Sequence, residues 1–234
     1  MLESYEIDLV DRTEVLRYLG YMGQDVTPEL DARLDEEIDH CIRTSRPQAS
    51  LRVFDVESRS QREDGTHVVH LAGSPLELAG ESMREHLDSA VKVGAFAVTI
   101  GMGVERELRR LSLTNHLDQL LFDAAATALV ERAADAAEAS LIARAHEFGL
   151  FTNYRFSPGY GDLPMETQPP LLRELGGERL GITLSPTLLM TPTKSVTAVV
   201  GMFEQRQSST RASCAHCPCH DFCKIRPTGR TCRG

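Results

Sequence analysis

The stretch VKVGAFAVTI, residues 91–100, is apolar at nearly every position and is followed by a turn signal, Gly101-Met102-Gly103. A strand that is apolar on both faces must be covered on both faces, so we expect a central, buried strand here.

The longest apolar run, Gly94 to Val104, is shorter than the about 18 residues that a membrane-spanning helix needs. The N-terminal MLESYEIDLV also lacks the pattern of a signal peptide, so we expect a cytoplasmic protein without a membrane anchor.

A long helical region is predicted after this strand. No proline occurs between residues 76 and 157, and eleven alanines lie between Ala124 and Ala145. Small side chains on a helix let another backbone approach it closely. We therefore expect this Ala-rich helix to pack tightly on the rest of the fold.

Hydrophobic periodicity predicts the remaining elements. We expect helices over 11–20, from Pro28 to just before Pro47, over 76–90 and over 168–175, and strands over 50–57, 67–73, 181–184 and 195–203. Cys41 lies on the apolar stripe of the second helix, which indicates a core residue. The order of strands, long helix and further strands predicts an α+β fold over residues 1–205.

The C-terminal tail, residues 206–234, differs from the rest of the chain. It contains six Lys/Arg and one acidic residue, so it carries +5, and residues 1–205 carry −14 of the net −9. The acidic body should repel nucleic acid. Five of the six cysteines also lie in this tail: Cys214, Cys217, Cys219, Cys223 and Cys232. Such crowding favours metal ligation or redox chemistry over a disulfide framework.

The spacing within the tail leaves three alternatives open. Zinc would take four thiolates, or thiolates with His216 or His220. An iron–sulfur cluster would use Cys214, Cys217 or Cys219, and Cys223, with Cys232 as the fourth ligand. Thiols that are unligated or redox-active are the third alternative.

The segment RFSPGY, residues 155–160, has the composition of a shaped loop. Pro158 fixes one φ angle, Gly159 permits a conformation that other residues resist, and Tyr160 is then aimed in a fixed direction. Arg155 supplies a planar fork of donors suited to a carboxylate. The alternative is an ordinary loop with a surface arginine.

Other residues that suggest chemistry have simpler explanations. VTIGMG gives G-x-G-x-x-Arg106 where a dinucleotide-binding turn has a third glycine, so a tight strand-to-helix turn explains it better. His67, His70 and His86 have no partner at a metal-ligand spacing, and we expect structural or surface roles for them.

Taken together, four ordered segments resemble the reactivation domain of cobalamin-dependent methionine synthase. They are GAFAVTIG (94–101), the Ala-rich helix, RFSPGY (155–160) and MTPTKSVTA (190–198). The likeness covers residues 91–203 and is loose over 1–90. It implies a helmet-shaped α+β domain with a mainly antiparallel, twisted sheet. Residues 1–90 would then form N-terminal helices and strands, 91–205 an S-adenosylmethionine-binding core, and 206–234 an added basic Cys-rich tail.

The resemblance also implies roles for individual residues. Arg155 would meet the methionine carboxylate, and Ser157, Gly159 and Tyr160 would shape the groove for the adenosine. The last strand would place Val199 and Val200 beside the ligand, and Asp135 on the long helix would face the cobalamin edge. For Asp135, a solvated carboxylate on a helix face is the alternative.

The sequence departs from the family at several positions. GDLPMET stands where longer members have a Cys-Pro-x-His segment, and Gly149 stands where they place an acidic residue. The chain also lacks D-x-H-x-x-G, the lower-ligand signature of a corrin-binding domain. Any cobalamin (vitamin B12) must therefore be held by another polypeptide.

The resemblance implies a free-standing protein that binds S-adenosylmethionine and supports reductive methylation of cob(II)alamin on a separate corrinoid protein. That partner would be methionine synthase lacking its own activation domain, within methionine biosynthesis, and a flavodoxin or ferredoxin would donate the electron. The enzyme activity would be part of this methyltransferase, and no side chain of this chain need act as acid or base. The alternative is a non-catalytic module that binds S-adenosylmethionine or a corrinoid protein, with a structural metal tail. A zinc-knuckle nucleic-acid protein and a conventional methyltransferase fit less well, because the body is acidic and the glycine fingerprint is missing.

Overall fold

The structure is a computed structural model that describes residues 1–21 and 23–207. The strands are β1 (Leu2–Ser4), β2 (Gln48–Gln61), β3 (His67–Leu71), β4 (Glu77–Ala79), β5 (Lys92–Thr99), β6 (Phe151–Thr152), β7 (Thr183–Leu184), β8 (Met190–Thr191) and β9 (Ser195–Phe203). The α-helices are α1 (Arg12–Tyr18), α2 (Pro28–Thr44), α3 (Glu81–His86), α4 (Met102–Thr114), α5 (His116–Glu147) and α6 (Gln168–Leu175). Two short 3-10 helices are η1 (Met165–Thr167) and η2 (Gly177–Leu180).

A curled, fully antiparallel sheet forms the centre of the fold. Its strand order is β4-β3-β2-β5-β9-β6, and β1 pairs with β2 as well. β5 lies between β2 and β9 and is buried over almost its whole length, so the prediction of a central, buried strand is confirmed. The register of β2 against β3 shifts between Val56 and Ser58, and such a bulge increases the local bend of a sheet.

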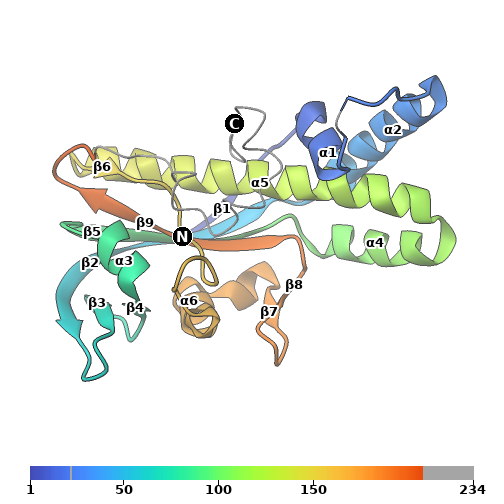
Figure 1. The fold of residues 1–234 in the computed structure, drawn as a ribbon. Coiled ribbons are helices and arrows are strands. Elements are labelled where there is room, and N and C mark those ends of the chain that lie inside the picture. The colour runs from blue at the N-terminus through green and yellow to red at the C-terminus, as the bar shows by residue number, and fades with distance from the viewer. Residues whose placement is uncertain (22, 208–234) are drawn as a thin grey trace.

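Helices cover both faces of this sheet. α5 extends along one face with α1, α2 and α4 around it, whereas α3 and α6 lie on the other (Figure 1). One core therefore lies between the sheet and α5, and contains Phe96, Val98 and Val200. The second core lies beneath α3 and α6, and contains Val93 and Val199.

The Ala-rich helix is α5, which extends over 32 residues. It begins where Asn115 leaves helical geometry and accepts hydrogen bonds from the backbone N–H groups of Leu117 and Asp118, at 3.1 and 3.2 Å. Its buried residues include Ala133, Ala134 and Ala137. The expected close packing against the sheet is confirmed, since a Cβ built on Gly94 of β5 would lie 3.0 Å from Leu141 of α5.

Two secondary-structure predictions were wrong in part. The helix expected over 76–90 is replaced at its start by β4, because Leu78 and Ala79 bury their side chains while pairing with Val69 and Val68 of β3. The strand expected over 181–184 is only two residues long. It pairs with β8 in a separate hairpin and does not join the main sheet.

Cys41 and the surface leucines illustrate how apolar residues are distributed. Cys41 is completely buried, as predicted, and burial raises the pKa of its thiol to about 12.

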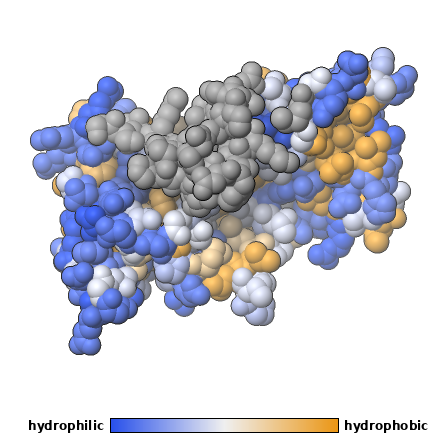
Figure 2. Space-filling model, viewed as in Figure 1, coloured by the Kyte–Doolittle hydropathy of each residue, from blue (hydrophilic) through white to orange (hydrophobic). Residues whose placement is uncertain are grey.

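Leu113, Leu117 and Leu120 remain exposed at the turn between α4 and α5. Figure 2 shows apolar side chains gathered at the end of the molecule where α2, α4 and α5 lie. No helix among the described residues is both long and apolar enough to span a membrane.

Candidate functional site

The RFSPGY segment lies in a loop that follows β6 and is fastened to β9. Phe156 and Val199 exchange two backbone hydrogen bonds, of 2.9 and 2.8 Å. Upstream, the Asn153 side-chain oxygen accepts a hydrogen bond of 2.8 Å from the Gly201 N–H. Residues far apart in the sequence are thereby fixed together, which gives the loop a defined path beside α5.

Arg155 points from this loop to three carboxylates on α5. Its Nη1 donates to Asp135 and to Glu138, each at 2.6 Å, and its Nη2 donates to Glu131 at 2.8 Å. The Arg155 backbone N–H also donates to Glu138, at 2.9 Å. The side chain of Arg155 is only 11% exposed. Burial alone would lower the pKa of Arg155, but the hydrogen bonds and charges of Asp135 and Glu138 raise it above its usual value.

The structure thus joins two residues to which sequence reasoning gave separate roles, Arg155 and Asp135. Sequence reasoning missed Glu131 and Glu138. A signal for them was present, because residues at positions i, i+4 and i+7 share one face of a helix, and 131, 135 and 138 have this spacing. The cation that this acidic face binds could not be identified from the helix alone.

Ser157, Gly159 and Tyr160 form a tight turn. The Tyr160 N–H donates to the Ser157 carbonyl at 3.2 Å, and the Gly159 N–H donates to the Leu163 carbonyl at 2.9 Å. Gly159 has a φ of 86°, and a Cβ there would lie 2.5 Å from the sulfur of Met165, so the turn requires glycine. Tyr160 is 62% exposed, so its ring is accessible from solvent.

Val199 and Val200, which the resemblance implies to lie beside the ligand, are on β9, the strand to which the loop is fastened. Both side chains are completely buried, Val199 in the core beneath α6 and Val200 in the core beneath α5. Because neighbouring side chains of a strand point to opposite faces, these two residues join the two layers. Neither side chain is available to a ligand in this structure, and Val199 supports the loop through its backbone bonds to Phe156.

His86 has the structural role that we expected. It is buried, and its ring lies 4.7 Å from that of Tyr154 and 5.1 Å from that of Phe156. His67 and His70 lie on β3. A ring nitrogen of His67 lies 3.8 Å from the Glu81 carboxylate, and one of His70 lies 3.8 Å from the Glu77 carboxylate.

In residues 1–21 and 23–207, no group of three or more His, Cys, Asp or Glu side chains could hold a metal ion. The predicted ligands Cys214, Cys217, Cys219, Cys223 and Cys232 lie outside the described residues.

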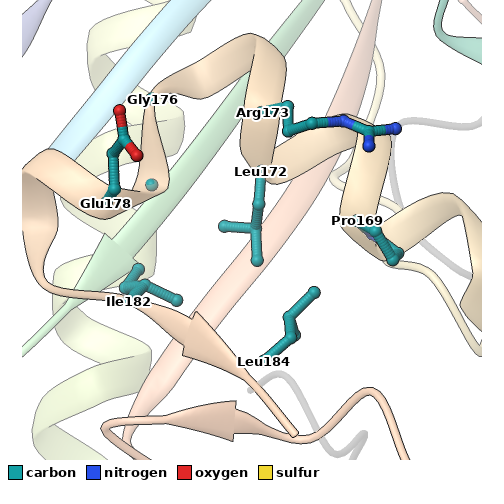
Figure 3. A pocket seen from close by; sticks show the side chains of 8 residues that line it. Pro169, Leu172, Arg173, Gly176, Glu178, Ile182 and Leu184 are labelled. Carbon is teal, nitrogen blue, oxygen red and sulfur yellow. The ribbon is translucent and has the colours of Figure 1, made fainter. Parts of the chain in front are cut away.

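A separate cavity of about 310 Å³ lies against α6, η2 and β7. Figure 3 shows Leu172 and Leu184 pointing toward each other across it, with Ile182 beside them. The residues that line this cavity include none of the predicted site residues. It belongs to the side of the sheet that α6 covers, whereas Arg155 meets α5.

No family model matches the sequence, and no curated protein matches it. Among the solved structures that match is the MetH reactivation domain bound to AdoHcy, with a TM-score of 0.58. The match covers 99% of this chain and 86% of that chain, at 16% sequence identity. At this identity the likeness shows the fold alone. The predicted fold class is confirmed: the chain has the α+β fold of the MetH reactivation domain.

Proposed function

We propose that this chain binds S-adenosylmethionine at the Arg155–Tyr160 loop and supports reductive methylation of cob(II)alamin on a separate corrinoid protein. The observation that carries the proposal is the fold, which is similar over 99% of the chain to a reactivation domain solved with AdoHcy. The loop adds a guanidinium whose side chain is only 11% exposed and, within six residues, an exposed aromatic ring. The partner would be methionine synthase that lacks its own reactivation domain, in the cytoplasm.

The contacts of Arg155 leave two of its N–H donors for a ligand carboxylate. A guanidinium has five N–H donors, and the hydrogen bonds of Arg155 to described side chains use three of them. An Nε–H and one N–H on Nη2 remain for a ligand. A carboxylate bound there would approach three negative charges on α5, so its affinity would depend on how strongly these acids are held by Arg155.

The chemistry that we propose needs orientation more than acid–base catalysis. The cobalt(II) of the partner takes one electron from a donor of the flavodoxin or ferredoxin class and becomes cobalt(I). Cobalt(I) then takes the methyl group of S-adenosylmethionine, and S-adenosylhomocysteine leaves. This chain holds the methyl donor in place, and proximity and orientation can supply up to about 7–11 kcal/mol of such a barrier. Asp135, with its side chain 52% exposed, would lie at the edge that meets cobalamin.

The proposal is tested by calorimetric titration of the anaerobically purified chain with S-adenosylhomocysteine. We expect saturable binding that Arg155→Met weakens at least about tenfold, the usual effect of losing a charge-assisted hydrogen bond. Arg132→Met is the matched control, because Arg132 is exposed on α5, the helix that Arg155 contacts, and makes no ion pair with a described residue. Absence of binding by the wild-type chain, or equal weakening by both substitutions, would contradict the proposal.

A non-catalytic binding module is the second candidate, and the same ligand would bind to it. The two are separated by adding a cob(II)alamin-loaded corrinoid protein, S-adenosylmethionine and a reductant. Formation of methylcobalamin that depends on this chain supports reactivation. Ligand binding without any effect on cobalt methylation supports the module.

For the Cys-rich tail we propose metal ligation, with zinc and an iron–sulfur cluster as the two alternatives. Zinc is colourless and would appear only in elemental analysis, whereas a cluster absorbs visible light. The double substitution Cys214→Ser and Cys217→Ser in the intact chain should remove the metal in both cases. If the wild-type chain contains no metal after anaerobic purification, metal ligation by the tail is contradicted.

A further inference from the structure

The loop that carries the proposed ligand site is held at both ends by the same short helix, α3. At the C-terminal end of α3, the Asn153 amide donates a hydrogen bond of 2.6 Å to the His86 carbonyl. At the N-terminal end, the Asp162 carboxylate accepts hydrogen bonds from the N–H groups of Glu81, at 2.6 Å, and Ser82, at 2.9 Å. Asn153 and Asp162 enclose the whole Arg155–Tyr160 segment, so α3 spans the loop from one end to the other.

Asp162 provides a cap that α3 does not supply for itself. The residue before the helix is Gly80, which has no side chain with which to cap the first N–H groups. An uncapped helix start leaves backbone donors unpaired, and an aspartate is among the best side chains to accept from them. Here the aspartate comes from a segment eighty residues further along the chain. The N–H groups of Glu81 and Ser82 in the first turn of α3 are therefore capped by the loop.

The approach of the loop to α3 is so close that it needs a glycine on each side. A Cβ on Gly80 would lie 2.7 Å from the Asp162 carboxylate, and a Cβ on Gly161 would overlap the Ser82 hydroxyl. Gly161 also has a φ of 54°, in the left-handed region that favours glycine. The start of α3 and the loop at Gly161 therefore pack so closely that a side chain at Gly80 or Gly161 would disturb the contact between them.

α3 itself is fixed to the rigid part of the fold. Met83 and Leu87 are completely buried in the core on this side of the sheet. The Arg59 side chain from β2 donates to the Leu87 carbonyl at 2.8 Å and to the Ala90 carbonyl at 2.7 Å. A position held on α3 is therefore held relative to the sheet and to β9.

We propose that α3 is a splint that holds the Arg155–Tyr160 loop in its ligand-binding shape, and that Asp162 and Asn153 are positioning residues through which it acts. The proposal rests on the proposed function, because it names how the same site is built. It assigns a role to GDLP, residues 161–164, where the sequence departs from the family pattern. The loop would be preorganised before ligand arrives, which lowers the entropy cost of binding.

The experiment compares Asp162→Ala, Asp162→Asn and a control, Asp11→Ala. Asp11 caps α1 by accepting a hydrogen bond of 2.8 Å from the Thr13 N–H, far from the loop in the sequence, so its loss is a matched loss of one helix cap. Three quantities are measured for each variant: the dissociation constant for S-adenosylhomocysteine, hydrogen exchange at the loop amides, and the free energy of unfolding.

We expect Asp162→Ala to weaken ligand binding about tenfold and to speed exchange at the amides of Gly159, Tyr160 and Leu163. Asp162→Asn keeps one acceptor and should have an intermediate effect, which also covers the case in which the alanine variant fails to fold. Asp11→Ala should lower the free energy of unfolding but leave the dissociation constant unchanged within about twofold.

Unchanged affinity and unchanged loop exchange in both Asp162 variants would overturn the splint. Equal weakening by Asp11→Ala would overturn it too, because general destabilisation would then explain the result. If the wild-type chain binds no ligand, the proposed function fails. Faster loop exchange in Asp162→Ala would then support α3 as a splint for the loop alone, and unchanged exchange would overturn that as well.

Discussion

The Nη1 of Arg155 donates a hydrogen bond of 2.6 Å to Oδ1 of Asp135. The same nitrogen also donates to Oε2 of Glu138, at 2.6 Å. The Arg155 guanidinium thus connects the loop to α5, the helix that covers the sheet. Any carboxylate that binds Arg155 from outside must compete with acids that are already in place. Under the proposed function, this competition would make the affinity for the ligand depend on the acidic face of α5, which gives the first prediction.

Asp135→Asn should increase the affinity for S-adenosylhomocysteine about three- to fivefold. The substitution removes one negative charge beside Arg155, and an exposed charge of this kind is worth up to about 1 kcal/mol. Calorimetric titration at pH 7 measures the change. Asp123→Asn is the control, since Asp123 lies on the same helix but pairs with Lys194, at 2.8 Å. Weaker binding by Asp135→Asn would show that Asp135 contacts a positive group of the ligand.

Arg155→Met should lower the free energy of unfolding by about 2 kcal/mol. It leaves Glu138, which is only 17% exposed, without the cation that neutralises it, and unpaired buried charges are costly. Urea denaturation at pH 7 measures the loss. Adding Glu138→Gln to Arg155→Met should restore part of the stability, because the stranded charge disappears. Strict additivity of the two substitutions would contradict this account.

The elements that sequence patterns predicted well are those whose burial is uniform or regular. The apolar run 91–100 identified β5, and the alanines identified α5, because both patterns extend over many residues. β4 was missed because three residues are too few to show a period of two, and its pairing with β3 is a long-range choice. Short strands depend on their neighbours more than on their own sequence.

The site was predictable only in part, for a related reason. The composition of RFSPGY indicated a shaped loop with a directed arginine, and the turn at Gly159 has the positive φ that this composition suggests. The partners of Arg155 and Asp162 lie on α5 and α3, and only the folded chain brings them together. Val199 and Val200 look alike in the sequence, yet they face opposite cores.

The stability of the helical end should depend on pH through Asp118. The Arg33 side chain of α2 donates to the Asp118 carboxylate of α5, and this hydrogen bond lowers the pKa of Asp118 below its usual 3.8. A carboxylate with a lowered pKa in the folded state stabilises the protein above the unfolded pKa, and this contribution is lost as pH falls through the folded pKa.

We therefore expect Asp118→Asn to cost at most about 1 kcal/mol at pH 7, because solvent screens this pair, and to cost much less at pH 3. Urea denaturation at the two pH values gives the difference. Asp39→Asn provides the comparison, because Asp39 is exposed on α2 and makes no ion pair with a described residue. A cost for Asp118→Asn that is equal at both pH values would show that the charge of Asp118 is not what stabilises this end.

Gly94→Ala should destabilise the fold by about 1–3 kcal/mol, because the contact between β5 and α5 leaves no room for a methyl group. A Cβ at this position would lie 2.8 Å from Met202 Cε and 3.0 Å from both terminal carbons of Leu141. Leu141→Ala alone opens a cavity and should cost about 2–5 kcal/mol. In the double variant the two faults compensate, since the new methyl group occupies part of the space that Leu141 vacates. The free energy of unfolding of the double variant should therefore exceed the additive expectation by about 1 kcal/mol or more. Additive costs would mean that Met202, and not Leu141, sets the close approach of this strand to its neighbours.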